Sequence, residues 1–379
     1  MRLVCTLLQV IIAFTHVAEA GPEDALATRY SKSQTAHARV TPSSGALVVG
    51  MLDTATDGSS STIRFKTISS AIAALDQHTT TVQTIFIGPG TYNEQVYVPP
   101  LKGPLIIQGY TCDARTYDGN TVTLRHSLSL GQLQDQNSTA ANDDNTATLR
   151  LWTAAGLRLY NINIENNFSP HPPSGGQALA VSASPLSTGG IGFYACQFSG
   201  YQDTLLADTG TQLYVGCRIQ GAVDFVFGRM ARAWFERCDV RVTGPGHITA
   251  SGRSSSDSSS WYVFNNGTVD VDESVSDSKS LTHKTYLGRP WAEYARVVFQ
   301  HTYLGSVVNP AGWAPWSKTP ENSNTGHVYF GEYGNTGPSS DLSQRAAFSK
   351  QLSAPVDMAT VLGTSWASQW WADKASYVT

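Results

Sequence analysis

Two aspartates of this chain, Asp203 and Asp224, stand 21 residues apart, and each follows a cysteine by seven positions. If the chain coils with this period, the two carboxylates become neighbours on adjacent coils, about 4.8 Å apart. Carboxylates at that spacing cannot both ionise freely, so we expect one raised pKa and a coupled titration. One ionised and one protonated carboxyl is the combination that nucleophilic and acid–base chemistry needs. A solvated polar ladder on the face of a repeat is the alternative interpretation, although the apolar run around Asp224 is costly for an unpaired charge.

The two aspartates belong to a longer repeat, because Cys196, Cys217 and Cys238 are also spaced by 21 residues. Other positions recur in phase with these cysteines, namely Phe193, Tyr214 and Phe235 before them and Phe198, Ile219, Val240, Gly200 and Gly221 after them. A repeat of this length with apolar and glycine positions in phase is typical of a solenoid. We therefore predict an all-β chain that forms a single-stranded parallel β-helix, with one repeat per coil.

The segments around the repeat must complete and close this solenoid. Residues 65–75 carry apolar side chains at helical spacing, which predicts a short helix that caps the N-terminal end of the core. Strands are expected at residues 84–87, 94–98, 104–108, 149–164 and 286–299. The polar stretches 131–146 and 265–284 predict long loops, of the kind that flank binding clefts on rigid scaffolds.

The two ends of the chain have their own signals. Residues 1–20 resemble a secretory signal peptide, with Arg2, an apolar run that is too short to cross a bilayer, and Ala18-Glu19-Ala20 as the cleavage site. Residues 21–379 are then expected to form one catalytic domain, with a loose leader at 21–45 and a packed, tryptophan-rich tail at 341–379. This organisation predicts a secreted, extracellular protein that is not held in a membrane.

Composition narrows the classes of partner. Charged residues make up 14% of the chain and the net charge is −4, so no basic stripe is available for nucleic acid. We expect neither a metal nor another cofactor, because no paired cysteine or histidine spacing is present. A monomer is expected. Three sequons are candidate glycosylation sites if they are exposed, at Asn137, Asn167 and Asn266.

Four cysteines remain beyond the signal peptide: Cys112, Cys196, Cys217 and Cys238. Stacked cysteines on adjacent coils lie within reach of a disulfide, and a secreted protein meets an oxidising compartment. The bridge Cys196–Cys217 is our preferred pairing, although four cysteines allow three pairings and sequence cannot choose among them. A ladder of free, buried thiols is the alternative.

With these features in place, the sequence resembles the pectin methylesterases, a family of secreted carbohydrate esterases. Five motif blocks follow one another in the order of that family: Gly90-Thr-Tyr-Asn-Glu94, Gly176-Gln-Ala178, Gly200-Tyr-Gln-Asp-Thr-Leu205, Gly221-Ala-Val-Asp-Phe-Val-Phe-Gly228 and Leu287-Gly-Arg-Pro-Trp291. Any one block is a weak signal, whereas five in order across about 200 residues are specific. The chain after about residue 335 adds nothing to the match.

The resemblance implies a right-handed parallel β-helix that hydrolyses galacturonate methyl esters in pectin and releases methanol. By position, Asp224 would be the nucleophile and Asp203 the general acid and base. Gln177 and Gln202 would stabilise the oxyanion. Arg289 would position the nucleophile, and Trp291 the sugar. The family's threonine contact upstream of the second block does not align with the Asp143-Asp144-Asn145 stretch found here.

The residues themselves are compatible with this chemistry. An ester needs a nucleophile, a stabilised oxyanion and a proton for the leaving alkoxide, and the chain lacks the Gly-x-Ser-x-Gly elbow of serine hydrolases. Arg289 beside Asp224 would keep that carboxylate ionised, unless the two form a purely structural ion pair. Gln177 and Gln202 offer neutral N–H donors, unless their amides merely ladder along the helix.

Other functions stay open from sequence alone. Trp291 and Tyr201 could bind sugar rings or could serve only in packing. A pectate lyase on this fold would need a calcium-binding carboxylate cluster, and a polygalacturonase would need further catalytic aspartates. A non-catalytic carbohydrate-binding β-helix would bind sugar without turnover.

Overall fold

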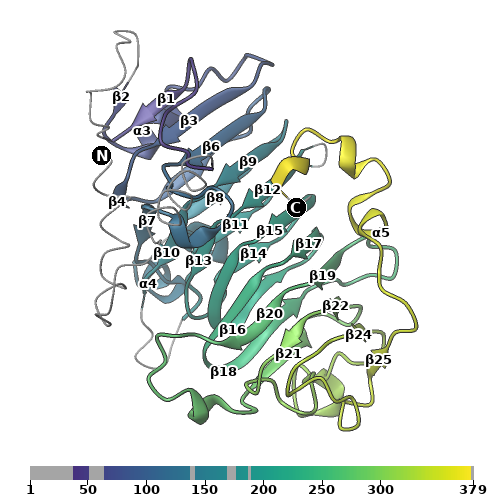
Figure 1. Ribbon diagram of the computed structural model, residues 1–379. Coiled ribbons are helices and arrows are strands. Elements are labelled where there is room, and N and C mark those ends of the chain that lie inside the picture. The colour runs from purple at the N-terminus through teal and green to yellow at the C-terminus, as the bar shows by residue number, and fades with distance from the viewer. Residues whose placement is uncertain (1–36, 51–63, 137–140, 169–175, 187–188, 377–379) are drawn as a thin grey trace, which may run out of the picture.

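The computed structural model describes residues 37–50, 64–136, 141–168, 176–186 and 189–376 (Figure 1). The predicted signal peptide at residues 1–20 and the sequon at Asn137 lie outside these described residues. Parallel strands stack coil upon coil along one axis, and each central coil contributes a strand to each of three ladders. This arrangement confirms the predicted right-handed parallel β-helix.

The first ladder is one continuous sheet, in the spatial order β2 (Arg64–Phe65), β1 (Leu47–Val49), β3 (Gln83–Ile87), β6 (Leu105–Gly109), β9 (Leu157–Tyr160), β12 (Gly190–Tyr194), β15 (Thr211–Val215), β17 (Arg232–Glu236), β19 (Trp261–Asn265), β22 (Arg296–Gln300), β24 (Tyr329–Tyr333) and β25 (Ser349–Gln351). The second ladder runs through β4 (Gly90–Asn93), β7 (Val122–His126), β10 (Asn163–Asn166), β13 (Gln197–Ser199), the first halves of β16 (Arg218–Gly228) and β18 (Asp239–Ser251), β20 (Thr268–Val271) and β23 (Tyr303–Leu304). The third ladder runs through β5 (Val96–Val98), β8 (Leu149–Leu151), β11 (Val181–Ala183), β14 (Leu205–Ala207), the second halves of β16 and β18, and β21 (Thr285–Pro290).

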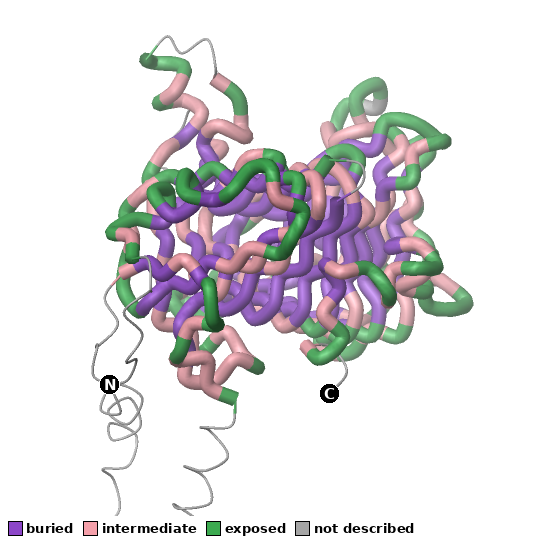
Figure 2. The backbone as a smooth tube through the Cα atoms, turned by 90° about the horizontal axis from the view of Figure 1, so that it is seen from above, coloured by how far each residue is buried: buried purple, intermediate pink, exposed green. Residues whose placement is uncertain are grey.

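The register of the coils follows the 21-residue period. Phe193 pairs with Tyr214, and Tyr214 pairs with Phe235, in the first ladder. Their rings stack inside the helix with centroids 4.6 and 4.5 Å apart, close to the spacing between strands. The stack continues through Phe264 and Phe299 in coils of other lengths. These aromatic rings form the centre of the buried core, which Figure 2 shows in purple.

A tight turn between the first and second ladders has the same conformation in successive coils. One residue of each turn adopts a left-handed backbone, with φ between 50° and 56°, at Asn161, Ala195, Gly216, Arg237, Asn266 and His301. Single residues tolerate this conformation, and asparagine and glycine tolerate it best. In the repeat, this residue stands directly before each phased cysteine.

Helix α3 (Ile68–Ala73) confirms the predicted N-terminal cap and buries Ile68 and Ile72 against the first coil. Glu94, the last residue of the first motif block, holds the start of this helix. Its carboxylate accepts hydrogen bonds from the backbone N–H groups of Ile68 and Ser69, at 2.7 and 2.9 Å. A carboxylate at a helix N-terminus satisfies unpaired donors and interacts favourably with the helix dipole. This glutamate therefore has a structural role.

The preferred disulfide Cys196–Cys217 is wrong, because Cys196, Cys217 and Cys238 are free, buried thiols. Each thiol instead donates to a backbone carbonyl of the preceding coil, at 3.5–3.6 Å, to Leu159, Phe193 and Tyr214 respectively. In-register stacking gives the cysteines parallel Cα–Cβ bonds, whereas a disulfide requires the two side chains to turn toward each other.

Two stretches that we predicted to be loops contain regular structure. The stretch 131–146 includes most of helix α4 (Leu130–Asp135) and the 3₁₀ turn η2 (Asp143–Thr146), each started by a side-chain cap from Ser129 or Asn142. The stretch 265–284 includes strand β20 and the 3₁₀ turn η3 (Ser278–Leu281). Within β20, Val269 lies in the core and Val271 packs against it, but neighbouring polar residues obscured these apolar positions in the sequence.

The described residues nearest to each end of the chain pack against the coils. Arg39, in the predicted leader, forms an antiparallel bridge with Thr111 and donates to Asn161. The tail lies along the outer face of the first ladder, where α5 (Met358–Leu362) is beside β17 (Figure 1). Its Leu362 and Trp371 are buried there. Among the described residues, no helix has both the length and the apolar character to cross a membrane.

Candidate active site

The predicted site residues gather where the third ladder begins. Parallel bridges join Gln177 to Gln202 and Gln202 to Val223, so three successive coils stack there in register. Asp203 and Asp224 directly follow the bridged residues Gln202 and Val223. The structure therefore confirms that the two aspartates are neighbours on adjacent coils. Both adopt positive φ, 64° and 50°, a conformation that aspartate tolerates better than most residues.

Gly200 and Gly221 explain why the two aspartate motifs begin with glycine. A Cβ atom on Gly200 would lie 2.7 Å from the Thr204 hydroxyl, and one on Gly221 would lie 2.4 Å from Cβ of Phe225. In each motif the glycine packs directly against the residue four positions later, so the chain makes a tight turn between them. A larger side chain would push apart the turn that carries the aspartate.

Arg289 holds Asp224 through a bidentate ion pair. Nε donates to Oδ1 at 2.9 Å, and Nη2 donates to Oδ2 at 2.6 Å. Arg289 lies in β21, where it pairs with Ala250 of β18, so its side chain reaches across a whole coil to Asp224 in β16. The small side chain of Ala250 leaves room for this crossing. The planar guanidinium fixes both the charge and the orientation of the carboxylate.

Burial and charge push the two carboxyls toward different protonation states. Asp203 and Asp224 are only 7% and 6% exposed. Burial raises the pKa of Asp203 well above its ordinary value, and the charge of Asp224 raises it further. Burial also raises the pKa of Asp224, but the hydrogen bonds and charge of Arg289 oppose that rise. The pair therefore favours a protonated Asp203 beside an ionised Asp224.

A third carboxyl, which sequence reasoning did not assign to the site, acts on this pair. Asp143 begins the turn η2, and its charge contributes to the raised pKa of Asp203. Burial raises the pKa of Asp143 itself, and the charge of Arg229 opposes that rise. Asp143 is in the stretch where the family threonine fails to align, so this difference in sequence places an acidic group near Asp203 and Asp224.

Gln177 and Gln202 have free side-chain amides. Within the described part of the chain, neither amide takes part in a hydrogen bond, although the backbone carbonyl of each accepts one. The alternative of an amide ladder would require a hydrogen bond between the two side chains. Both are partly exposed beside Asp203, so their N–H groups remain available to a substrate oxygen.

Aromatic rings lie beside the ion pair. Trp291 packs near Phe227, with ring centroids 6.1 Å apart, in a cluster that also includes Trp316. The Arg289 guanidinium carbon lies 4.3 Å from the centre of the Trp316 ring. Sequence reasoning missed Trp316, because it follows Arg289 by 27 residues and belongs to no repeat. Tyr201 is separate from this cluster, since its ring lies against Gly244.

His247 is a second neighbour of Asp224 that the sequence did not reveal. Its Nδ1 lies 3.8 Å from Oδ1 of Asp224 and has no hydrogen-bond partner among the described residues. Burial, together with the charge of Arg289, lowers the pKa of His247 to about 3. The imidazole is therefore neutral and adds no second positive charge. No group of three His, Cys, Asp or Glu side chains in the described residues is arranged to hold a metal ion.

Comparison with known proteins gives a consistent result. Residues 52–360 match the model of the Pectinesterase family. A pectinesterase of Aspergillus niger is 45% identical over 92% of this chain and 97% of its own length. A pectinesterase of Aspergillus aculeatus is also 45% identical, over 92% of this chain and 97% of its own length.

Solved structures agree with the sequence matches. The crystal structure of a pectin methylesterase from Aspergillus niger superimposes with a TM-score of 0.74 at 38% identity, covering 89% of this chain and 99% of that one. A pectin methylesterase from carrot gives a TM-score of 0.70 at 29% identity, covering 86% of this chain and 97% of that one.

Proposed function

This chain belongs to the pectinesterase family and hydrolyses pectin methyl esters, and we propose that Asp224 is its nucleophile and Asp203 its general acid and base. The observation that carries this assignment is the unequal pair itself: two buried, adjacent carboxyls, of which only Asp224 is held by an arginine. A merely structural ion pair would not need a second carboxyl beside it, at a cost in burial.

In the first half of the reaction, an oxygen of Asp224 attacks the carbonyl carbon of the methyl ester. The carbonyl oxygen becomes an oxyanion, which the amide N–H groups of Gln177 and Gln202 stabilise. Asp203 gives its proton to the departing methoxide, and methanol leaves. The products of this half-reaction are an anhydride between Asp224 and the galacturonate acyl group, and an ionised Asp203.

In the second half, the ionised Asp203 removes a proton from a water molecule, and the resulting hydroxide attacks the acyl carbon. The bond to Asp224 breaks, which regenerates its carboxylate and leaves a free galacturonate carboxyl. Arg289 lowers the energy of the departing Asp224 carboxylate in the same way as it holds the resting one. At the end of the cycle Asp203 is protonated and Asp224 is ionised, as at the start, and one water molecule has been consumed.

Trp291 and Trp316 would form an aromatic wall for the sugar ring that carries the ester. Both rings are only partly buried. Trp291 packs near Phe227, and Trp316 lies against the Arg289 guanidinium of the ion pair. Flat aromatic faces suit the apolar C–H faces of sugars. Family membership decides in favour of the esterase over the lyase, polygalacturonase and non-catalytic alternatives.

The assignment is tested with highly methylated pectin, by measuring methanol, acid and chain length together. The wild-type chain should release methanol and acid in equal amounts without shortening the polymer. Asp224→Ala should lose at least about 10⁴-fold in rate while its far-UV circular dichroism stays β-rich. Methanol release at the wild-type rate by Asp224→Ala would exclude the nucleophile role.

Removal of metal ions should leave the rate unchanged, because every step above uses protein side chains and water. The measurement is methanol release after dialysis against EDTA, with and without added calcium. A loss of activity that calcium restores would contradict the mechanism.

Secretion and a monomeric state complete the proposal. The predicted signal peptide, the family's substrate in cell walls and the sequons support secretion. Asn167 is exposed, and its side chain has no hydrogen bond within the described chain, which favours it as a glycan acceptor. Asn266 is also exposed, but its side-chain nitrogen donates to Glu236 at 3.1 Å. Peptide mapping of the secreted protein would identify the occupied sequons.

A further inference from the structure

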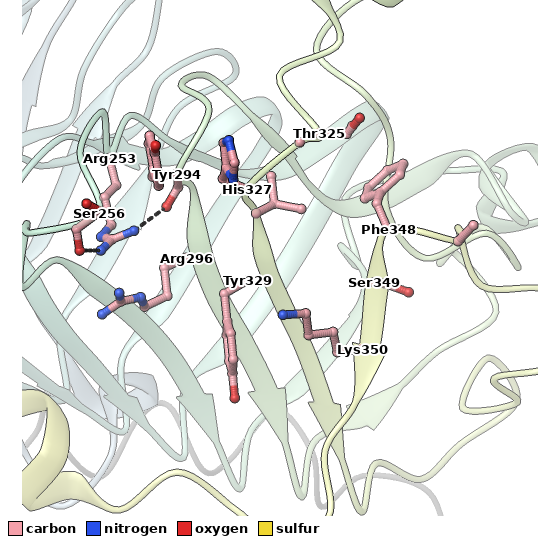
Figure 3. Close-up of a pocket in the computed structure, with 13 residues that line it drawn as sticks. Arg253, Ser256, Tyr294, Arg296, Thr325, His327, Tyr329, Phe348, Ser349 and Lys350 are labelled. Carbon is pink, nitrogen blue, oxygen red and sulfur yellow. Dashed lines mark hydrogen bonds between the residues drawn. The ribbon is translucent and has the colours of Figure 1, made fainter.

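A concave surface is lined by residues that lie close in the sequence to Trp291 of the aromatic wall. It has a volume of about 590 Å³, within the range of about 300–1,000 Å³ found for ligand pockets. We call it the cationic groove and define it by Arg253, Tyr294, Arg296, His327, Tyr329 and Lys350 (Figure 3). Arg253 follows Gly252, against which the Trp291 ring packs, and Tyr294 follows Trp291 by three residues. The chain that leads into the groove at Gly252 therefore contacts the Trp291 ring.

Aromatic and cationic side chains lie next to one another at the start of three adjacent strands. Trp261, Arg296 and Tyr329 occupy adjacent positions at the start of β19, β22 and β24. The Arg296 guanidinium carbon lies 4.5 Å from the centre of the Trp261 ring. Lys350 of β25 extends toward Tyr329 (Figure 3), with its ammonium 5.0 Å from the centre of that ring.

Two cations of the groove, Arg296 and Lys350, have no carboxylate partner among the described residues. Within the described residues, neither Arg296 nor Lys350 forms an ion pair or a side-chain hydrogen bond to a carboxylate. Arg253 is 3% exposed and donates only to the backbone carbonyls of Ser256, Ser258 and Tyr294. Burial, together with the charge of Arg253, lowers the pKa of Arg296 to about 10. Two arginines thus repel each other, a situation that a bound anion would relieve.

Two carboxylates border the groove and must be counted. Glu293 lies 3.4 Å from Nε2 of His327, which stacks on Tyr294, and both partners are about half exposed. Asp257 lies near enough to Arg253 to influence its pKa. Neither carboxylate contacts Arg296 or Lys350. The positive charge without a carboxylate partner therefore belongs to Arg296 and Lys350, which both lie next to Tyr329.

We propose that the cationic groove binds a stretch of unesterified galacturonate, so that the enzyme holds polymer that it has already de-esterified. Sugar carboxylates would pair with Arg296 and Lys350, and the sugar rings would lie on Tyr329 and Tyr294. A methyl-esterified stretch carries no charge and would gain nothing from the two cations. Binding at the groove and at the active site of one polymer raises the local concentration of the remaining esters. This inference rests on the proposed pectin esterase function.

The binding test uses the full chain carrying Asp224→Ala, so that no ester is turned over during titration. Isothermal titration with an unesterified oligogalacturonide should give an affinity that falls at least about tenfold when Arg296→Ala and Lys350→Ala are added. A double variant at exposed lysines elsewhere, Lys102→Ala with Lys279→Ala, removes the same charge and should leave the affinity unchanged. Lys350→Ala alone provides the same test, with a smaller loss, if the double groove variant does not fold.

Three results would overturn the proposal. The first is equal affinity of the groove variant and the parent chain for the unesterified oligomer. The second is an equal loss in the Lys102→Ala and Lys279→Ala control, which would indicate general charge attraction. The third is equally tight binding of inorganic polyphosphate at the groove, which would exclude recognition of uronate.

A rate measurement separates this proposal from the proposed function. In the catalytically intact background, Arg296→Ala with Lys350→Ala should keep the initial rate on fully methylated pectin but lose the advantage on partly de-esterified pectin. If the wild-type chain releases no methanol from either polymer, the proposed function fails. If the variant and the wild type behave alike on both polymers, only the groove proposal fails.

Discussion

The same 21-residue repeat stacks two sets of side chains with opposite chemistry, one of thiols and one of carboxyls. We call these two columns of side chains the thiol ladder and the carboxyl ladder. Cys196, Cys217 and Cys238 are completely or almost completely buried, and each donates to a backbone carbonyl. Asp203 and Asp224 are also buried, but they compete for one proton, and only Asp224 has a cationic partner. Regular stacking alone therefore does not make a site. Reactivity comes from placing like charges in register and then compensating only one of them.

The backbone sharpens the contrast. The cysteines follow the left-handed turn residue that recurs in successive coils, so their conformation is part of the scaffold. Asp203 and Asp224 are themselves in the left-handed region, in the connection between the second and third ladders. Local strain of this kind is tolerated where the surrounding structure enforces it, and it concentrates at functional sites.

The largest expected effect is the loss of rate when Arg289 is removed, because its charge is what makes Asp203 and Asp224 unequal. Arg289→Ala should lower kcat by roughly 10³-fold, because a buried carboxylate that loses its partner costs about 3–5 kcal/mol. The pKa of Asp224 should rise, so the acid limb of the pH–rate profile should move to higher pH. Arg289→Lys, which keeps the charge but not the bidentate geometry, should recover only part of the rate. An unchanged acid limb in Arg289→Ala would contradict this role.

The next effect concerns the amides that no structural hydrogen bond occupies. Gln202→Ala should lower kcat by about 10²-fold with little change in KM, since its donor is needed mainly in the transition state. Gln197→Ala is the matched control, because Gln197 lies on the same coil but donates its amide to the Tyr117 carbonyl away from the carboxyls. A larger rise in KM than fall in kcat would show that Gln202 serves substrate binding instead.

The sequence could predict that Asp203 and Asp224 are neighbours because the 21-residue repeat fixes their relative positions. The spacing of Asp203 and Asp224, and the bridge between Gln202 and Val223, follow from coils of equal length. Asp143 and Trp316 reach the site from irregular connections, and His247 reaches it from β18 after a register shift against β16, so no periodicity marks them. The thiol ladder was misjudged for a related reason: the period gives the distance between coils but not the direction of each side chain.

The thiol ladder should affect stability without affecting catalysis. Cys217→Ala should lower the free energy of unfolding by about 1–2 kcal/mol through the cavity that it leaves, while kcat per folded molecule stays unchanged. In the native wild-type protein, the three thiols should not react with Ellman's reagent. Rapid labelling under native conditions, or a loss of kcat in Cys217→Ala, would show that the two ladders are not independent.

The smallest expected effect is a gain in stability when Asp203, which destabilises the folded state near neutral pH, is replaced. The pKa of Asp203 is raised in the folded state, so its ionisation opposes folding at pH values above the unfolded pKa of about 3.9. Asp203→Asn should therefore melt about 1–3 °C higher than wild type near neutral pH. The gain should shrink as the pH falls and should vanish below about pH 4, where the unfolded carboxyl is also protonated. Thermal melts of both proteins across this pH range test the sign.

The most direct test of the unequal pair is to trap the acyl group on Asp224. Asp203→Asn lacks both the acid and the base, but a p-nitrophenyl ester of galacturonate needs no acid to expel its leaving group. Mixing the two should release one equivalent of nitrophenol per enzyme in a burst, followed by slow turnover. Mass spectrometry should place the galacturonyl adduct on the peptide that contains Asp224. The account would be contradicted if no burst and no adduct formed, or if the adduct lay on any other residue.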